Sequence, residues 1–420
     1  MENFRMTTDG SSGLRTRFLL ALVAGIACAA SGHSQALIPG LSSGGGIRLL
    51  QTDLAVLKSQ EPRRDLPCAV TMRKPELGFD FMFHTGYEAR VPIRELAGEG
   101  NELTVLFSVV SEDHPNDRSY VTGSMRVPAI EERSKRAITF YDNFALGEGR
   151  FHVDWLMRDE RNRVCAMSWD LEARLNSKDG ELRQWIPQAL VQVPGVPFAE
   201  EPRVIREPGK PLPRFSIIVN LDPPDPSATL IDDQSLYGLL AILRQMERDP
   251  RIEPYSIIMC SLETQQVLYQ QENRSSIDLS ALEEALSSPK FGTVDAKRLV
   301  STDGPAQFAA DLVRGQLNNA NSDVLVVLGP KRGSEIGVSR QTLESFGRPG
   351  KPAFYLSYEM GQPPSLWRDP ISSIVKRLRG FEYRITRPKD FFHAWSDVVA
   401  RIMRVKQAPQ APTAPTAASQ

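Results

Sequence analysis

Six prolines fall within twenty residues near the middle of the chain, and this cluster restricts the fold more than any other feature. They are Pro194, Pro197, Pro202, Pro208, Pro211 and Pro213. Proline fixes its own φ angle and has no backbone N–H, so neither a helix interior nor a central strand tolerates such a run. The cluster predicts a proline-rich linker over residues 174–212, between folded blocks at residues 66–173 and 213–406.

The first 36 residues have the pattern of a signal peptide. Arg15 and Arg17 precede an apolar run at residues 18–30, which is shorter than the roughly 20 residues that span a bilayer. The small residues up to Ala36 are typical of a cleavage site. We expect cleavage before Leu37 and export to the periplasm, the cell surface or the medium. Lipidation at Cys28 and retention of the segment as an anchor remain as alternatives.

Two further segments are predicted to lack a core. Residues 37–65 form a flexible linker because they include a Ser/Gly run at residues 42–46, and residues 407–420 form a disordered Ala/Pro/Thr tail. The whole chain carries 50 basic and 51 acidic residues, for a net charge of −1. This balance argues against nucleic-acid binding, which usually needs a basic excess.

We expect no membrane span in the mature chain.

The first block, residues 66–173, is predicted to be an all-β, immunoglobulin-like sandwich. Its short runs alternate in polarity, turn residues separate them, and about seven strands of this spacing fit such a sandwich. The predicted strands are residues 78–84, 88–93, 103–111, 120–127, 137–144, 150–157 and 163–170.

Cys68 and Cys165 lie near the two ends of this block, in a chain with four cysteines. In an exported protein they can form a structural disulfide, which typically contributes about 2–4 kcal/mol. The alternative is a pair of buried free thiols, since strand pairing is not readable from sequence.

The second block, residues 213–406, alternates strands with helices. Continuous apolar runs predict buried strands, and apolar residues at helical spacing predict the helices between them. This order predicts a mostly parallel, Rossmann-like α/β sheet with one antiparallel edge strand. The predicted strands are residues 215–221, 255–261, 265–271, 324–328, 353–357 and 381–386, and the helices are residues 232–247, 279–286, 305–318, 366–379 and 390–405.

The order of these elements resembles a von Willebrand factor A-type domain. The best-matching stretches are residues 215–240, 304–329 and 354–357. The resemblance implies an α/β fold with a binding surface at the carboxyl ends of its strands. The sandwich in front of it resembles the modules found beside such domains in uncharacterised exported bacterial proteins.

Metal-binding members of that family hold a divalent ion with oxygen ligands from three loops. The corresponding positions here are Asn220, Asp222, Pro224, Ala306 and Pro330, and only Asp222 supplies a carboxylate. The motif is therefore degenerate. We expect no metal and no cofactor at this site.

The loops at those strand ends are the predicted contact surface for another protein. Their polar residues are Asp222, Asp225, Ser227, Asp303, Lys331, Arg332 and Ser334. Asp303 precedes Pro305, an arrangement that also predicts an N-cap.

The sequence as a whole predicts an exported, non-enzymatic protein-binding or adhesion-type protein. A hydrolase or anion-handling enzyme is the first alternative, with Asp222, Ser357 or Lys331 at the same end of the sheet. An architectural component of the cell envelope is the second.

Overall fold

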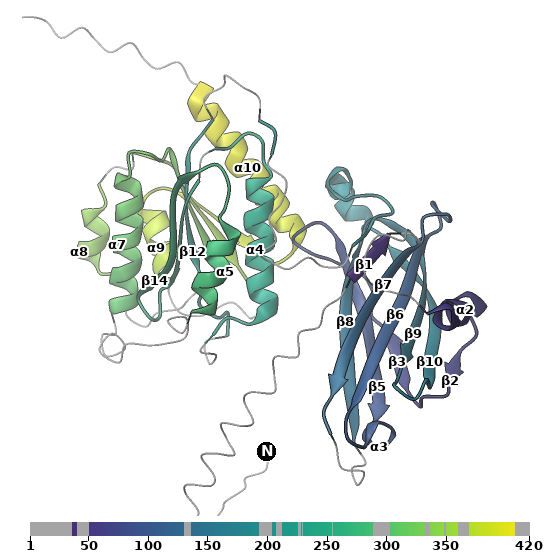
Figure 1. Ribbon diagram of the computed structural model, residues 1–420. Helices are drawn as coiled ribbons and strands as arrows, with labels where there is room; N and C mark the ends of the chain where they lie inside the picture. The colour runs from purple at the N-terminus through teal and green to yellow at the C-terminus, as the bar shows by residue number, and fades with distance from the viewer. Residues whose placement is uncertain are drawn as a thin grey trace, which may run out of the picture.

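A computed structural model describes most of the chain in three sheets and the helices around them (Figure 1). The described residues are 36–39, 50–129, 136–192, 204–206, 212–225, 228, 230–253, 255–288, 303–331, 337–347, 350–359 and 369–407. Residues 1–35 of the predicted signal peptide, residues 408–420 of the predicted tail, Ser227, Arg332 and Ser334 lie outside them.

The N-terminal part is a sandwich of two antiparallel sheets. The first sheet has the order β1 (Ala36–Pro39), β7 (Ser119–Val127), β6 (Asn101–Ser111), β9 (Gly149–Arg158), β10 (Val164–Ala173) and β2 (Arg63–Arg64). The second has the order β11 (Val191–Gln192), β8 (Ala137–Leu146), β5 (Phe83–Pro92) and β3 (Ala69–Met72), with β4 (Glu76–Leu77) also paired to β5. Three short helical segments accompany them: α2 (Gln51–Ser59), α3 (Ile93–Leu96) and η1 (Ser177–Trp185).

Alternation of side chains fills the space between these sheets. On β9, Phe151, Val153 and Trp155 are all buried, as period two requires of a strand facing a core. Trp155 is completely buried and its ring lies 5.1 Å from that of Tyr87 on β5. The aromatic centre of the sandwich therefore joins one strand from each sheet.

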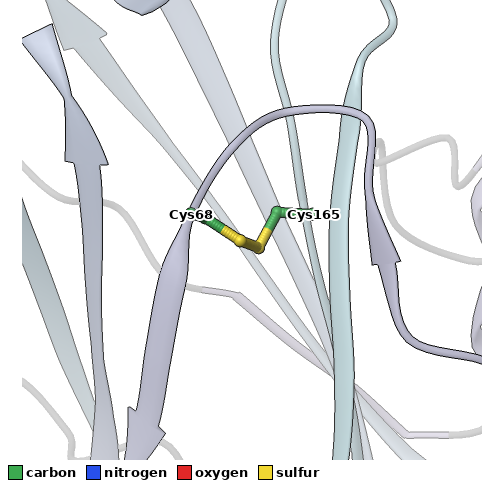
Figure 2. The surroundings of a disulfide bond; sticks show 2 residues. All are labelled: Cys68 and Cys165. Carbon is green, nitrogen blue, oxygen red and sulfur yellow. A yellow bond between two sulfur atoms is a disulfide. The ribbon is translucent and has the colours of Figure 1, made fainter.

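The disulfide predicted between Cys68 and Cys165 is present (Figure 2). Cys68 directly precedes β3 in the second sheet, and Cys165 lies on β10 in the first. Their Cα atoms are 6.3 Å apart, and the bridge joins residues 97 positions apart in sequence. It therefore fastens the two sheets of the sandwich to each other.

The C-terminal part contains a third, mixed sheet. Its order is β14 (Gln266–Arg274), β13 (Tyr255–Ser261), β12 (Phe215–Asn220), β15 (Val324–Gly329), β16 (Ala353–Tyr358) and β17 (Phe381–Ile385). β14 pairs antiparallel to β13, and the other neighbours pair in parallel. The helices are α4 (Asp233–Glu247), α5 (Leu279–Ser287), α7 (Gly304–Asn318), α8 (Arg340–Ser345), α9 (Pro370–Arg377) and α10 (Pro388–Gln407).

Helices cover both faces of this sheet, so β12, β15 and β16 are buried along their whole length. Leu239 of α4 and Val398 of α10 belong to the core on one face, and Val313 of α7 and Ile374 of α9 belong to the core on the other.

Local sequence fixes where these helices begin: Asp232 accepts a hydrogen bond from the backbone N of Ser235 and caps α4. Asp369, Asp278 and Ser339 cap α9, α5 and α8 in the same way.

The predicted fold class, an immunoglobulin-like sandwich followed by a Rossmann-like von Willebrand factor A-type domain, is wrong as a description of this chain. The sandwich has sheets of six and five strands instead of about seven strands in all. Segments assigned to linkers supply β1, β2 and β11, and β3 and β4 were not predicted, whereas the predicted strands at residues 78–84 and 88–93 both overlap the single strand β5. The third sheet is mixed, and antiparallel pairs outnumber parallel ones over the described chain.

The two parts of the molecule pack against each other. Side chains of the sandwich and of the third sheet belong to one continuous cluster of buried apolar residues. In Figure 1, α4 and α10 lie on the side of the third sheet nearest the sandwich. No helix in the described part of the chain is long and apolar enough to cross a membrane.

Candidate functional site

The candidate site is the carboxyl edge of the third sheet, which we define as residues 221–225, 262–265, 330–331 and Glu359. These residues directly follow β12, β13, β15 and β16. Because the four strands are parallel, their carboxyl ends lie at the same edge of the sheet. Chain direction thus brings together loops that lie far apart in the sequence.

Asp222 is the centre of the first group on this edge. It is 1% exposed, and its carboxylate accepts hydrogen bonds from Ser261 Oγ at 2.6 Å and from the backbone N of Glu263 at 3.2 Å. The side-chain Oδ1 of Asn220 in turn accepts a hydrogen bond from the backbone N of Asp222 at 3.2 Å. Asp222 therefore fixes the turn between β13 and β14 against the end of β12.

Glycine at position 329 lets β15 approach β12 at this edge. Gly329 has φ of 146°, and a Cβ atom there would lie 2.6 Å from the backbone O of Asn220. Pro330 follows directly, and its carbonyl oxygen accepts a hydrogen bond from the hydroxyl of Tyr355 at 3.3 Å. The prolines at positions 224 and 330 thus shape the backbone of the edge and supply no side-chain ligand.

Lys331 and Glu359 form the second group. The Nζ atom of Lys331 lies 2.6 Å from Glu382 Oε1 and 3.7 Å from Glu359 Oε1, and Arg384 Nε lies 2.7 Å from Glu359 Oε2. Burial lowers the pKa of Lys331, but its hydrogen bond and attraction to Glu382 outweigh that effect and leave the pKa raised. Lys331 is therefore a charged residue whose acidic partners lie within this chain.

Ser357 does not have the setting of a catalytic nucleophile. It is fully buried, and its hydroxyl donates a hydrogen bond to Glu359 Oε1 at 3.0 Å. A substrate needs access to the attacking oxygen, so Ser357 would have to be uncovered first.

The remaining predicted site residues are distributed around the same end of the sheet. Ala306 is buried in the first turn of α7, where it offers no ligand atom. Asp303 occupies the N-cap position of α7, but the predicted side-chain capping hydrogen bond is not made. Asp225 is exposed after β12. Gly304 lies beside the side chain of Gln265, so the start of α7 adjoins the turn between β13 and β14.

The sequence did not identify Glu382 as the partner of Lys331, or Arg384 as the partner of Glu359. Glu382 and Arg384 lie two positions apart on β17 and therefore share a face of that strand. This period-two pair on the last strand, together with Glu359 directly after β16, is the signal that would have identified the ionic group. Leu230 and Tyr237 were also missed, although their side chains are 46% and 50% exposed at the N-terminal end of α4.

A second polar cluster lies on the outer face of the sandwich, on β9 and β10. His152 Nδ1 is 2.7 Å from Asp170 Oδ1, and His152 Nε2 is 3.0 Å from Asp154 Oδ1. The buried carboxylate of Asp154 also accepts hydrogen bonds from Arg118 at 2.9 Å and Ser168 at 2.9 Å. Burial lowers the pKa of His152, but the hydrogen bond to Asp170 and the charge of Asp154 outweigh it and raise the pKa above 6.5.

Within the described residues, no three His, Cys, Asp or Glu side chains gather closely enough to hold a metal ion.

Because the Asp222 carboxylate already accepts hydrogen bonds from Ser261 and Glu263, we expect magnesium, manganese and calcium to leave the melting temperature of the protein unchanged. Thermal unfolding with each chloride salt, against potassium chloride at equal ionic strength, tests this. A saturable rise that Asp222→Ala abolishes would contradict the expectation.

Comparisons with known proteins leave the family of this chain undetermined. No family model matches the sequence, and no curated protein matches it. Solved structures resemble it only weakly. The structural-genomics target SoR45 has 12% identity and a TM-score of 0.18, over 27% of this chain and 94% of that chain.

Two glycosidases give scores in the same range. A calcium-binding mutant of Bacteroides uniformis beta-glucuronidase 2 has 11% identity and a TM-score of 0.17, over 74% of this chain and 38% of that chain. A glycosyl hydrolase family 2 member from Bacteroides cellulosilyticus has 9% identity and a TM-score of 0.18, over 76% and 39%. The chain thus matches well under half of each glycosidase, and we infer neither fold nor function from these scores.

Proposed function

We propose that the protein is exported and binds another protein, without catalysing a reaction, through the carboxyl edge of the third sheet and the adjoining N-terminal end of α4. The observation that carries this proposal is the exposure of two large apolar side chains at that place. Leu230 is 46% exposed and Tyr237 is 50% exposed. Tyrosine is enriched in protein interfaces because it combines a large apolar ring with a hydrogen-bonding hydroxyl.

The reactive side chains of the edge support the same proposal. Lys331 contacts Glu382, Asp222 accepts hydrogen bonds from the turn after β13, and Ser357 is buried against Glu359. These contacts give the three side chains structural roles inside the chain: Asp222 joins the ends of β12 and β13, Lys331 reaches β17, and Ser357 positions Glu359. The hydrolase alternative has less support because its candidate nucleophile is fully buried. The edge is therefore a preformed surface, as interfaces that bind with little rearrangement are.

Site-specific photocrosslinking tests the proposal. A photoreactive phenylalanine derivative replaces Tyr237 in the full-length chain, and the matched control replaces Tyr141, which is 69% exposed on β8 of the sandwich. We expect a discrete crosslinked product in cells from position 237 and none from position 141. The reason is that only position 237 adjoins the proposed contact surface.

Competition makes the result specific to this surface. Excess purified wild-type protein should suppress the crosslink at position 237 in an envelope extract, whereas the Leu230→Ser variant should suppress it several-fold less well. Equal crosslinking from positions 237 and 141, or equal competition by both proteins, would rule out the proposed surface.

A further inference from the structure

The strongest feature outside the carboxyl edge is an aromatic wedge, which we define as Phe79 and Phe81 in the turn between β4 and β5. The backbone N of Gly78 donates to the carbonyl O of Met82 at 2.8 Å, and the N of Phe81 donates to the carbonyl O of Gly78 at 3.0 Å. Phe81 has φ of 60°, in the left-handed region that a bulky residue rarely adopts. A conformation of this cost persists only where surrounding contacts hold it in place.

Those contacts come from the C-terminal part of the molecule and from η1. The ring of Phe79 lies 5.5 Å from that of Tyr358 at the end of β16. The ring of Phe81 lies 6.4 Å from Phe391 of α10, stacked, and 6.2 Å from Trp185 of η1. Phe79 is 6% exposed and Phe81 is 3% exposed, so the packing of the two parts buries the wedge.

Asp80, between the two aromatic residues, connects the wedge to both sides. Its carbonyl O accepts a hydrogen bond from Gln245 Nε2 of α4 at 3.1 Å. Its carboxylate accepts one from the backbone N of Met82 at 3.1 Å, and both carboxylate oxygens lie 2.9 Å from Nε2 of His84. The conformation of the turn therefore depends on a carboxylate–imidazole pair.

The surroundings of His84 favour its protonated form. Burial lowers its pKa, but the hydrogen bond and the attraction from Asp80 outweigh burial and raise the pKa above 6.5. His84 lies on β5, where the opposite residue on β4 is Glu76 and the opposite residue on β8 is the uncharged Ala145. The charged groups that the strand register and the turn place beside the imidazole are thus both acidic.

We propose that Asp80 and His84 form a pH-sensitive latch, which holds the aromatic wedge between α4, α10 and the end of β16 and releases it as the pH rises. Because the pKa of His84 is raised in the folded protein, its contribution is complete below the unfolded value of about 6.5 and disappears as the pH rises through the folded pKa. The latch goes beyond the proposed function and does not depend on it, because no binding partner takes part.

Hydrogen exchange followed by mass spectrometry on the full chain tests the latch. Peptides that cover residues 78–84 are compared from about pH 5.5 to about pH 8.5, after correction for the intrinsic pH dependence of exchange. We expect protection of this turn to fall several-fold over that range in the wild type. In His84→Gln, which cannot ionise, protection should be independent of pH.

Two further variants separate the latch from other effects. His152→Gln removes another histidine with a raised pKa and should leave the pH response of residues 78–84 intact. Gln245→Leu removes the hydrogen bond to the Asp80 carbonyl and should lower protection at every pH while the pH response persists. A wild-type turn with no pH response, or a response that persists in both His84→Gln and Asp80→Asn, would overturn the proposal.

Discussion

Replacing both Cys68 and Cys165 with Ser is expected to lower the free energy of unfolding by about 2–5 kcal/mol. The disulfide joins residues 97 positions apart and connects one sheet of the sandwich to the other. Its loss enlarges the unfolded ensemble and also removes the link between the two sheets. Urea-induced unfolding, followed by circular dichroism under oxidising conditions, measures the change.

The variant supplies its own control. A reducing agent should destabilise the wild-type protein by a similar amount and leave the double variant unaffected, since the third described cysteine, Cys260, is a buried free thiol. Identical unfolding curves for oxidised wild type and the double variant would show that the bridge adds nothing to stability.

The second large effect is expected at Gly329, where β15 reaches the carboxyl edge. Gly329→Ala places a side chain on a backbone with φ of 146°, at a cost of about 1–3 kcal/mol. The new Cβ would also lie 2.6 Å from the backbone O of Asn220, and relieving such overpacking typically costs a further ~1–3 kcal/mol. We expect a markedly lower melting temperature and weaker protection of β12 and β15 in hydrogen exchange.

Gly315 is a matched control for that substitution. It lies exposed in α7, and no neighbouring atom comes within 4 Å of a Cβ built there. Gly315→Ala should be neutral or stabilise the helix by up to about 1 kcal/mol, because alanine loses less backbone entropy on folding. If the two substitutions proved equally harmless, β15 would not need glycine at its end.

Buried strands are the part of this fold that sequence predicts best. The apolar run at residues 215–221 predicts a strand, and β12 occupies Phe215–Asn220; the run at residues 324–328 likewise corresponds to β15, Val324–Gly329. Strands covered on both faces need continuous apolar sequence, so their signal is local and strong. The bridge between Cys68 and Cys165 was one of two possibilities from sequence, and the packing of the two sheets decides it.

Short elements and long-range pairs were not predictable. β2 and β11 have two residues each, too few to show a period, so the segments that contain them resemble linkers. The Lys331–Glu382 contact and the Phe81–Phe391 stack join residues that only the packing of the sheets brings together. Local pattern places each of these residues on an element, but it does not identify the partner.

The aromatic turn between β4 and β5 shows that the proline-rich segment separates two blocks of sequence that share one packed interior. Prolines divide the sequence into two blocks, yet Phe79 and Phe81 from the first block are buried against Tyr358 and Phe391 of the second. If either block were produced alone, its own rings of this set would be exposed to water and would form an apolar surface patch that promotes aggregation. Truncation at the proline-rich segment would therefore expose buried apolar side chains of both blocks. Substitutions in one block are likewise constrained by the residues of the other block that they contact.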